Sequence, residues 1–230
     1  MSIADRLAEV RARIAAAARS AGRDPSSIRL VAVSKTVPLS LIRDAWQAGQ
    51  RDFGENRVQE GLQKIETSAD LEIRWHLIGH LQTNKARKAG AAFATIQSVD
   101  SVELLQKLDQ AAGEAGTTPD LLIQVDLGGE ATKFGAAPGD VPRLFEAAAR
   151  LQAARVVGLM TLPPMPDTPE EARPWFRTLR GLRDEWRASG VPASMLAELS
   201  MGMSGDFEVA IQEGATMVRV GTAIFGSRHA

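Results

Sequence analysis

Short apolar segments that alternate with helical segments restrict the fold of this chain more than any other feature. Residues 30–33 are apolar without a break, and the strand that they predict ends at Lys35. Such continuous apolar runs are typical of parallel strands covered by helices. The predicted strands lie in residues 29–38, 51–54, 73–79, 93–100, 119–127, 154–160, 197–200 and 216–226. Eight strand–helix units in 230 residues predict a (β/α)8 TIM barrel.

The signals between these strands support one domain over residues 1–230. Apolar residues spaced by three and four predict a leading helix within residues 1–20. Thr168 with Pro169 and Glu171 predicts the start of a long helix, and Asn56 with Gln59 predicts another. We interpret the proline-dense residues 162–174 as one loop after a strand. An open doubly wound sheet is the alternative, but no GxGxxG motif follows the first strand.

Composition excludes several classes of function. The chain has no cysteine, which excludes disulfides, thiol catalysis and Cys-ligated metals. Its three histidines form no HExxH motif, so we expect no zinc site. A net charge of −1 offers no basic excess for nucleic acid or an anionic membrane. Residues 1–22 lack the long apolar run of a secretory signal, and nothing reaches membrane-spanning length. We therefore expect a cytoplasmic protein.

The carboxyl ends of the strands carry the candidate chemistry, because in a parallel barrel the active site forms there. Lys35 ends the first strand. The glycine-rich residues 200–205 and 221–226 follow the seventh and eighth strands. Glycine permits close approach to an anion, and barrels commonly bind phosphate with these two loops. The alternative is that the glycines only shape tight turns.

Arg219 lies within the last predicted strand between Val218 and Val220. Side chains alternate along a strand, so if the valines face the helices, Arg219 points into the barrel. A structural salt bridge is the alternative reading of a buried arginine. A lysine, two phosphate loops and an inward arginine together suggest pyridoxal phosphate, whose aldehyde forms an imine with a lysine amine.

The motifs in these segments resemble those of the pyridoxal-phosphate homeostasis proteins, which are small single-domain proteins of the alanine-racemase N-terminal fold class. The likeness extends from about residue 30 to residue 226. It is carried by "VAVSKTVP", "DFGENRVQE", "RWHLIGHLQTNK", "QSVDS", "QVDLGGEATKFG", "GLMTLPP" and "LSMGMSGDFEVAIQEGATMVRVGTAIFG". One departure is Arg57, where many relatives have tyrosine.

The resemblance implies a single-domain TIM barrel of the alanine-racemase N-terminal type, with pyridoxal 5'-phosphate held as an imine on Lys35. It implies a cofactor site made of Lys35, Asn56, His76, Ser200, Met201, Gly202, Arg219, Gly221 and Thr222. In this site the residues of the two glycine loops contact the phosphate, and Arg219 faces the pyridine nitrogen.

Some of these residues have a structural alternative. Asn56 is alternatively the N-cap of its helix, and His76 is alternatively a core histidine. We expect Lys85, Glu130 and Lys133 to be solvated charges on loops at the same face.

The resemblance implies a protein that carries or buffers pyridoxal 5'-phosphate and influences linked amino-acid and keto-acid pools, without robust catalytic turnover. It also implies a monomer, with enzymes that require the cofactor as candidate partners. A cofactor-dependent amino-acid racemase is one alternative, and a class I aldolase that uses the barrel lysine directly is another. The absence of tyrosine weakens the racemase alternative, because alanine racemases use a tyrosine as their second base.

Overall fold

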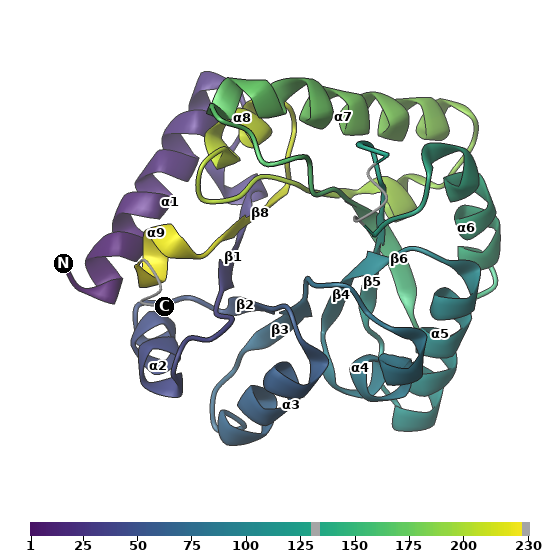
Figure 1. Ribbon diagram of the computed structural model, residues 1–230, viewed down its shortest axis with the longest axis horizontal. Helices are drawn as coiled ribbons and strands as arrows, with labels where there is room; N and C mark the ends of the chain where they lie inside the picture. Colours follow the sequence, from purple (N-terminus) through teal and green to yellow (C-terminus); the bar gives the residue numbers. More distant parts are fainter. Residues whose placement is uncertain (130–133, 227–230) are drawn as a thin grey trace.

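A computed structural model of the chain shows a closed barrel of eight parallel strands that is surrounded by helices (Figure 1). The structure describes residues 1–129 and 134–226. The strands follow one another around the barrel in chain order, and pairing of the first with the last closes it. This confirms the predicted (β/α)8 fold. The strands are β1 (Arg29–Val33), β2 (Asp52–Glu55), β3 (Arg74–Leu77), β4 (Thr95–Val99), β5 (Asp120–Gln124), β6 (Arg155–Met160), β7 (Glu198–Ser200) and β8 (Met217–Val220).

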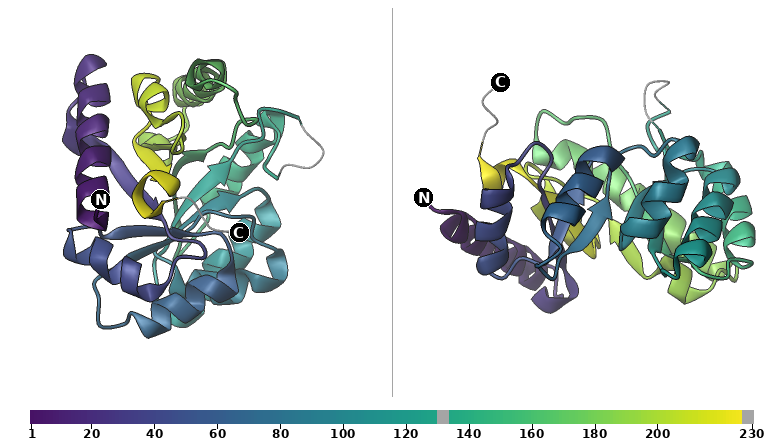
Figure 2. Two further views of the ribbon diagram at one scale, coloured as in Figure 1. Left: turned by 60° about the vertical axis from the view of Figure 1, so that its left-hand side comes forward. Right: turned by 90° about the horizontal axis from the view of Figure 1, so that it is seen from below.

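The helices cover the outside of the barrel and bury their apolar stripes against the strands (Figure 1). The α-helices are α1 (Ile3–Ser20), α2 (Leu39–Gln47), α3 (Val58–Thr67), α4 (Ala86–Ala92), α5 (Val102–Ala115), α6 (Val141–Ala148), α7 (Arg173–Ala188), α8 (Phe207–Gln212) and α9 (Thr222–Phe225). Ser2 and Asp5 form a capping box at the start of α1. This leading helix lies beside α8 and α9, so both ends of the barrel sequence meet there (Figure 2).

Three helix and strand boundaries differ from the sequence prediction. The N-cap of α3 is Arg57 and not Asn56, and it makes no side-chain capping bond. Thr168 precedes a 3-10 helix (Pro169–Ala172), so α7 begins only at Arg173. Within residues 216–226, only Met217–Val220 is strand, and the glycine turn leads into the short helix α9. In each case the local sequence signals placed the boundary within a few residues, but they did not determine the residue at which the helix or strand begins or ends.

The barrel has an apolar layer outside its strands and a polar line of side chains inside them. Val218 and Val220 belong to the apolar core between strands and helices. Arg219 lies between them on β8 and points inward, where only 3% of its surface remains exposed. The alternation of side chains along a strand explains this arrangement. Among residues 1–129 and 134–226, no helix combines the length and apolar character that a bilayer crossing requires.

Candidate cofactor site

A cavity of about 600 Å³ opens at the carboxyl ends of the strands. The segments after β1, β2, β3, β6, β7 and β8 contribute to its wall. Of the residues predicted from the sequence, the wall includes Lys35, Asn56, Arg219, Gly221 and Thr222. The topology therefore gathers residues from three distant segments of the chain at one end of the barrel.

The other predicted residues lie elsewhere. Ser200 and Met201 are fully buried at the end of β7, and His76 is buried inside the barrel. None of these three, nor Gly202, contributes to the cavity wall. The part of the seventh loop that faces the cavity is instead Met203–Ser204–Gly205–Asp206, a few residues further along the chain.

Lys35 lies in a tight turn directly after β1. The amide of Val37 donates to the carbonyl of Ser34 at 2.9 Å, which closes a four-residue β-turn. Thr36 in this turn has a φ of 61°. This left-handed conformation is unfavourable for a β-branched residue, so the surroundings must hold the turn in place.

Helix α3 supplies that support. The amide of Thr36 donates to Glu60 Oε1 at 2.6 Å, and Lys64 Nζ donates to the carbonyl of Ser34 at 2.7 Å. Lys64 also forms ion pairs with Glu60 at 2.8 Å and with Glu55 at 2.9 Å. Burial raises the pKa of Glu55, whereas its hydrogen bonds to Lys64 and Ser34 oppose that rise. Sequence reasoning missed this support, although the i, i+4 spacing of Glu60 and Lys64 was a usable signal.

Arg219 is held by two contacts inside the barrel. Its Nη1 donates to Ser200 Oγ at 2.5 Å, and its Nη2 donates to the carbonyl of Thr161 at 2.9 Å. Burial lowers the pKa of Arg219 to about 10, while the nearby Asp206 carboxyl opposes that shift. The guanidinium therefore remains protonated at neutral pH and presents a fixed positive charge to the cavity.

A line of buried hydrogen bonds continues from Arg219 through the barrel. Ser200 Oγ donates to Gln97 Oε1 at 2.6 Å, and Gln97 Nε2 contacts His76 Nδ1 at 3.0 Å. His76 Nε2 contacts Asp52 Oδ1 at 3.0 Å, at the amino end of β2. Burial lowers the pKa of His76, so a neutral imidazole accepts from Gln97 and donates to Asp52. His76 is thus a core histidine whose partners are side chains.

The glycines of the two loops have different roles. Gly202 has a φ of +92°, and an added Cβ would lie 2.5 Å from Ala210 Cβ, so this glycine serves packing against α8. A Cβ at Gly205 would meet no atom within 4 Å, so this backbone borders open space at the cavity wall. The amide of Gly221 donates to Ser204 Oγ at 3.1 Å, which ties the two loops together. Of the seventh loop, residues 203–206 line the cavity, whereas the predicted phosphate contacts at Ser200, Met201 and Gly202 stay a prediction.

The proline-dense loop supplies a further wall. Leu162, Met165 and the residues from Pro166 to Pro169 line the cavity, and Met165 is 88% exposed. The sequence identified this segment as a loop after a strand but did not connect it with the site. Lys85 ends a 3-10 helix (Thr83–Lys85) and does not line the cavity. Glu130 and Lys133 lie outside the described residues.

The fold and this site define a parallel barrel that presents one lysine and one buried arginine to a ligand cavity. The chain belongs to the alanine racemase N-terminal domain family, whose model matches residues 6–229. Among the described residues, no group of three histidine or acidic side chains is arranged to hold a metal ion.

Individual relatives agree with this assignment. The chain is 46% identical over 228 residues to a pyridoxal phosphate homeostasis protein of Aquifex aeolicus (strain VF5), covering 99% of both chains. PipY of Synechococcus elongatus PCC7942, solved with PLP bound, is 43% identical with a TM-score of 0.84, over 98% of this chain and 100% of PipY. Alanine racemase of Clostridium difficile 630 shares the fold, with 18% identity and a TM-score of 0.71 over 89% of this chain and 56% of the racemase.

Proposed function

We propose that the protein holds pyridoxal 5'-phosphate in the carboxyl-end cavity and carries or buffers it within the cell. The observation that carries this proposal is that Lys35, Arg219 and two glycine loops border one cavity. The homeostasis protein of Aquifex aeolicus and the PLP-bound PipY support it, because they match this chain over nearly its whole length.

The residues of the cavity suit the three parts of this cofactor. When bound, the cofactor supplies an aldehyde that reacts with amines and a ring that withdraws electrons. Lys35 supplies the amine. Gly205 leaves backbone open to the cavity, and Ser204 and Thr222 bring hydroxyl groups to its wall, which together suit a phosphate. Arg219 supplies a donor for the pyridine nitrogen.

Arg219 also explains why we propose carriage and not efficient catalysis. A protonated arginine can donate to the pyridine nitrogen but does not keep that nitrogen charged as a carboxylate would. The ring is then a weaker electron sink. The chain contains no tyrosine, and His76, the other candidate for a second base, is engaged by Asp52 and Gln97 inside the barrel. The racemase alternative therefore has the shared fold in its favour and lacks a placed second base.

Borohydride trapping tests the assignment of Lys35. The protein loaded with pyridoxal 5'-phosphate should show a visible absorption band that borohydride abolishes, and peptide mapping should place the added mass on Lys35. A mass on Lys85 would refute the assignment. A protein that stays colourless with added cofactor would refute the proposed function and favour the aldolase alternative.

Isotope exchange tests the racemase alternative. We expect the loaded protein, incubated with a single amino-acid enantiomer in deuterated water, to place no deuterium at Cα of the opposite enantiomer over many turnovers. Sustained incorporation that is lost on His76→Ala would overturn the carrier proposal.

We further propose that the protein acts in the cytoplasm as a monomer and passes the cofactor to enzymes that require it. A direct transfer predicts that such an apoenzyme is activated faster than free cofactor leaves the protein. Equal rates would mean that the cofactor is first released into solution. Light scattering of the purified protein tests separately whether it is a monomer.

A further inference from the structure

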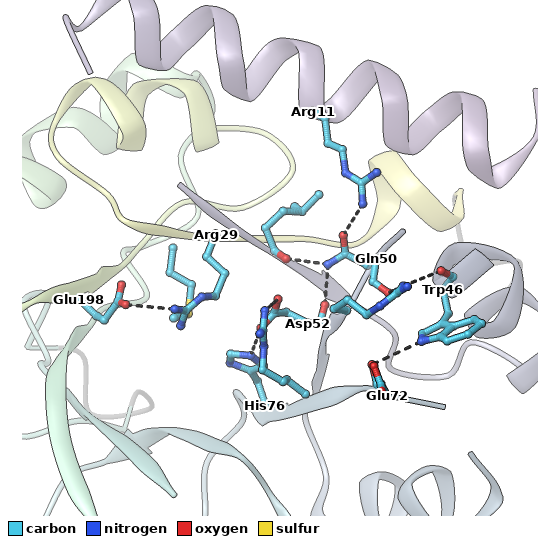
Figure 3. A network of polar contacts seen from close by, with 12 residues as sticks. Arg11, Arg29, Trp46, Gln50, Asp52, Glu72, His76 and Glu198 are labelled. Carbon is cyan, nitrogen blue, oxygen red and sulfur yellow. Dashed lines mark hydrogen bonds and ion pairs between the residues drawn. The ribbon is translucent and has the colours of Figure 1, made fainter. Parts of the chain in front are cut away.

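A second cavity, of about 490 Å³, lies at the opposite end of the barrel from Lys35. Its wall combines the middle of α1 with the first residues of three neighbouring strands, Arg29 of β1, Asp52 of β2 and Arg74 of β3. Figure 3 shows part of this wall, with Arg11 reaching from α1 toward Gln50 and with Arg29, Asp52 and His76 below it. Nothing in the proposed cofactor function uses this cavity.

Arginine dominates the charge of this cavity. The cavity is lined by four arginines, Arg11, Arg29, Arg51 and Arg74. Among the described residues, Asp52 is the one carboxylate that lines it. Asp52 is already engaged, because Arg74 binds both its oxygens at 2.8 and 2.6 Å and His76 contacts it at 3.0 Å. Glu198 lies 3.5 Å from Arg29 but is not part of the wall. The cavity therefore keeps a surplus of positive charge in a protein whose net charge is −1.

Arg11 and Arg51 are held in place by neutral groups. Arg11 donates to the carbonyl of Ala48 at 2.9 Å and to Gln50 Oε1 at 3.2 Å. Arg51 donates to the carbonyls of Trp46 at 2.7 Å and of Gln50 at 3.0 Å, and its guanidinium lies 4.6 Å from the Trp46 ring centroid. Within residues 1–129 and 134–226, neither arginine has a carboxylate partner.

Gln50 fixes this arrangement from inside. Its Nε2 donates to the carbonyls of Leu30 and Asp52, both at 2.7 Å, and only 3% of the residue is exposed. Its Oε1 is thereby turned toward Arg11 (Figure 3). The hydrogen bonds from Arg11 and Arg51 to backbone carbonyls cap the end of α2, and they use some of the N–H groups of the two guanidinium groups. A guanidinium has five such groups, so others remain for a ligand.

The positive charge of Arg51 also acts on Arg11. Burial lowers the pKa of Arg11, and the neighbouring positive charge of Arg51 lowers it further. A bound anion would reverse the second effect. Oxygens of a phosphate group accept from several guanidinium groups in different directions, which suits arginines that arrive from one helix and three strand starts.

We propose that the amino-end cavity is a binding site for a compact phosphate-class dianion, held by Arg11, Arg29, Arg51 and Arg74. The site is separate from the carboxyl-end cavity and does not depend on the cofactor function. Free inorganic phosphate and a small phosphate monoester share this chemistry.

Calorimetric titration of the cofactor-loaded protein with inorganic phosphate, at ionic strength held constant with chloride, tests the site. We expect saturable binding of one phosphate per protein. An unchanged visible cofactor band would show that phosphate does not displace the cofactor from the carboxyl-end cavity. Arg51→Gln and Arg29→Gln should each weaken binding by about tenfold or more, because each removes hydrogen bonds to a charged group. Arg87→Gln on α4 is the matched control, since Arg87 has an 87% exposed side chain and does not line this cavity; it should leave binding unchanged.

Glycerol phosphate titrated in parallel distinguishes the two sources. Tighter binding of glycerol phosphate than of inorganic phosphate would identify a phosphorylated metabolite as the ligand, and the reverse would identify free phosphate. Circular dichroism checks that each variant folds. If Arg51→Gln does not fold, Arg29→Gln decides, because Arg29 has a 40% exposed side chain and caps no helix end. Non-saturable heat, or equal binding in the variants and in the wild type, would overturn the proposal.

Discussion

The two ends of the barrel both present basic side chains, but at the carboxyl end Asp167 and Asp206 line the same cavity, whereas arginine predominates at the amino end. At the carboxyl end, Lys35 and Arg219 face a cavity that backbone loops complete, and Arg219 is 3% exposed. At the amino end, arginines converge from strand starts and from α1, and Arg74 keeps a 62% exposed side chain. A cofactor that must be enclosed suits the first end, whereas an anion that exchanges with solvent suits the second.

The line of hydrogen bonds from Arg219 to Arg74 joins these two ends through the core. A buried polar group without a partner is costly, so every member of this line depends on its neighbours. Substitutions at either end, or along the line, can therefore show whether the ends act independently.

Lys35→Arg should have the largest effect. Arginine keeps the positive charge but does not form a stable imine, so borohydride should leave no pyridoxyl mass on the chain. Phosphate binding at the amino end should remain, measured by the same titration. A visible band in Lys35→Arg would mean that a lysine other than Lys35 carries the cofactor. The assignment of the cofactor to the carboxyl-end cavity would then be wrong.

Gly202→Ala and Gly205→Ala separate packing from ligand contact at the carboxyl end. Gly202→Ala combines a left-handed backbone with a 2.5 Å clash against Ala210, so we expect it to lower the free energy of unfolding by roughly 2–5 kcal/mol. Gly205→Ala meets open space and should leave stability nearly unchanged. It should instead weaken pyridoxal 5'-phosphate binding more than pyridoxal binding. Denaturant unfolding and cofactor titration measure the two effects, and equal loss of both ligands in Gly205→Ala would exclude this loop from the phosphate site.

Ser200→Ala tests the line between the ends. It removes the hydroxyl that joins Arg219 to Gln97, and we expect a loss of about 1–3 kcal/mol in the free energy of unfolding together with an altered cofactor spectrum. Ser98→Ala is the matched control, because Ser98 is equally buried and its hydroxyl has no hydrogen-bond partner among the described residues. Equal effects of both variants would show that lost volume, and not the hydrogen bonds, is responsible.

The pH dependence of stability should show the smallest effect. Burial lowers the pKa of His76 below its ordinary value of 6.5, so at lower pH the unfolded chain takes up a proton that the folded chain does not. Stability should fall as the pH drops below about 6.5, by at most about 1.4 kcal/mol per pH unit for one proton. His76→Gln should reduce this slope. An unchanged slope in unfolding experiments between pH 5 and 7 would contradict a neutral buried His76.

The sequence by itself predicted parallel strands covered by helices, because continuous apolar runs at regular intervals are typical of strands buried on both faces. Eight such units favoured a barrel over an open doubly wound sheet. The sequence also placed Lys35, Asn56, Gly221 and Thr222 at strand ends, where the topology alone brings them to one cavity. The inward direction of Arg219 followed from its two valine neighbours. These inferences needed only local spacing and chain order.

Only the tertiary structure decided which residues near those strand ends face the cavity. The glycine pattern does not distinguish Gly202, which packs against α8, from Gly205, which borders open space. His76 is turned toward Asp52 and Gln97, and these partners lie 24 and 21 residues away along the chain. Likewise, the amino-end arginines are unremarkable as single positions. They become one surface only because β1, β2 and β3 start side by side beneath α1, a packing arrangement that no local pattern encodes.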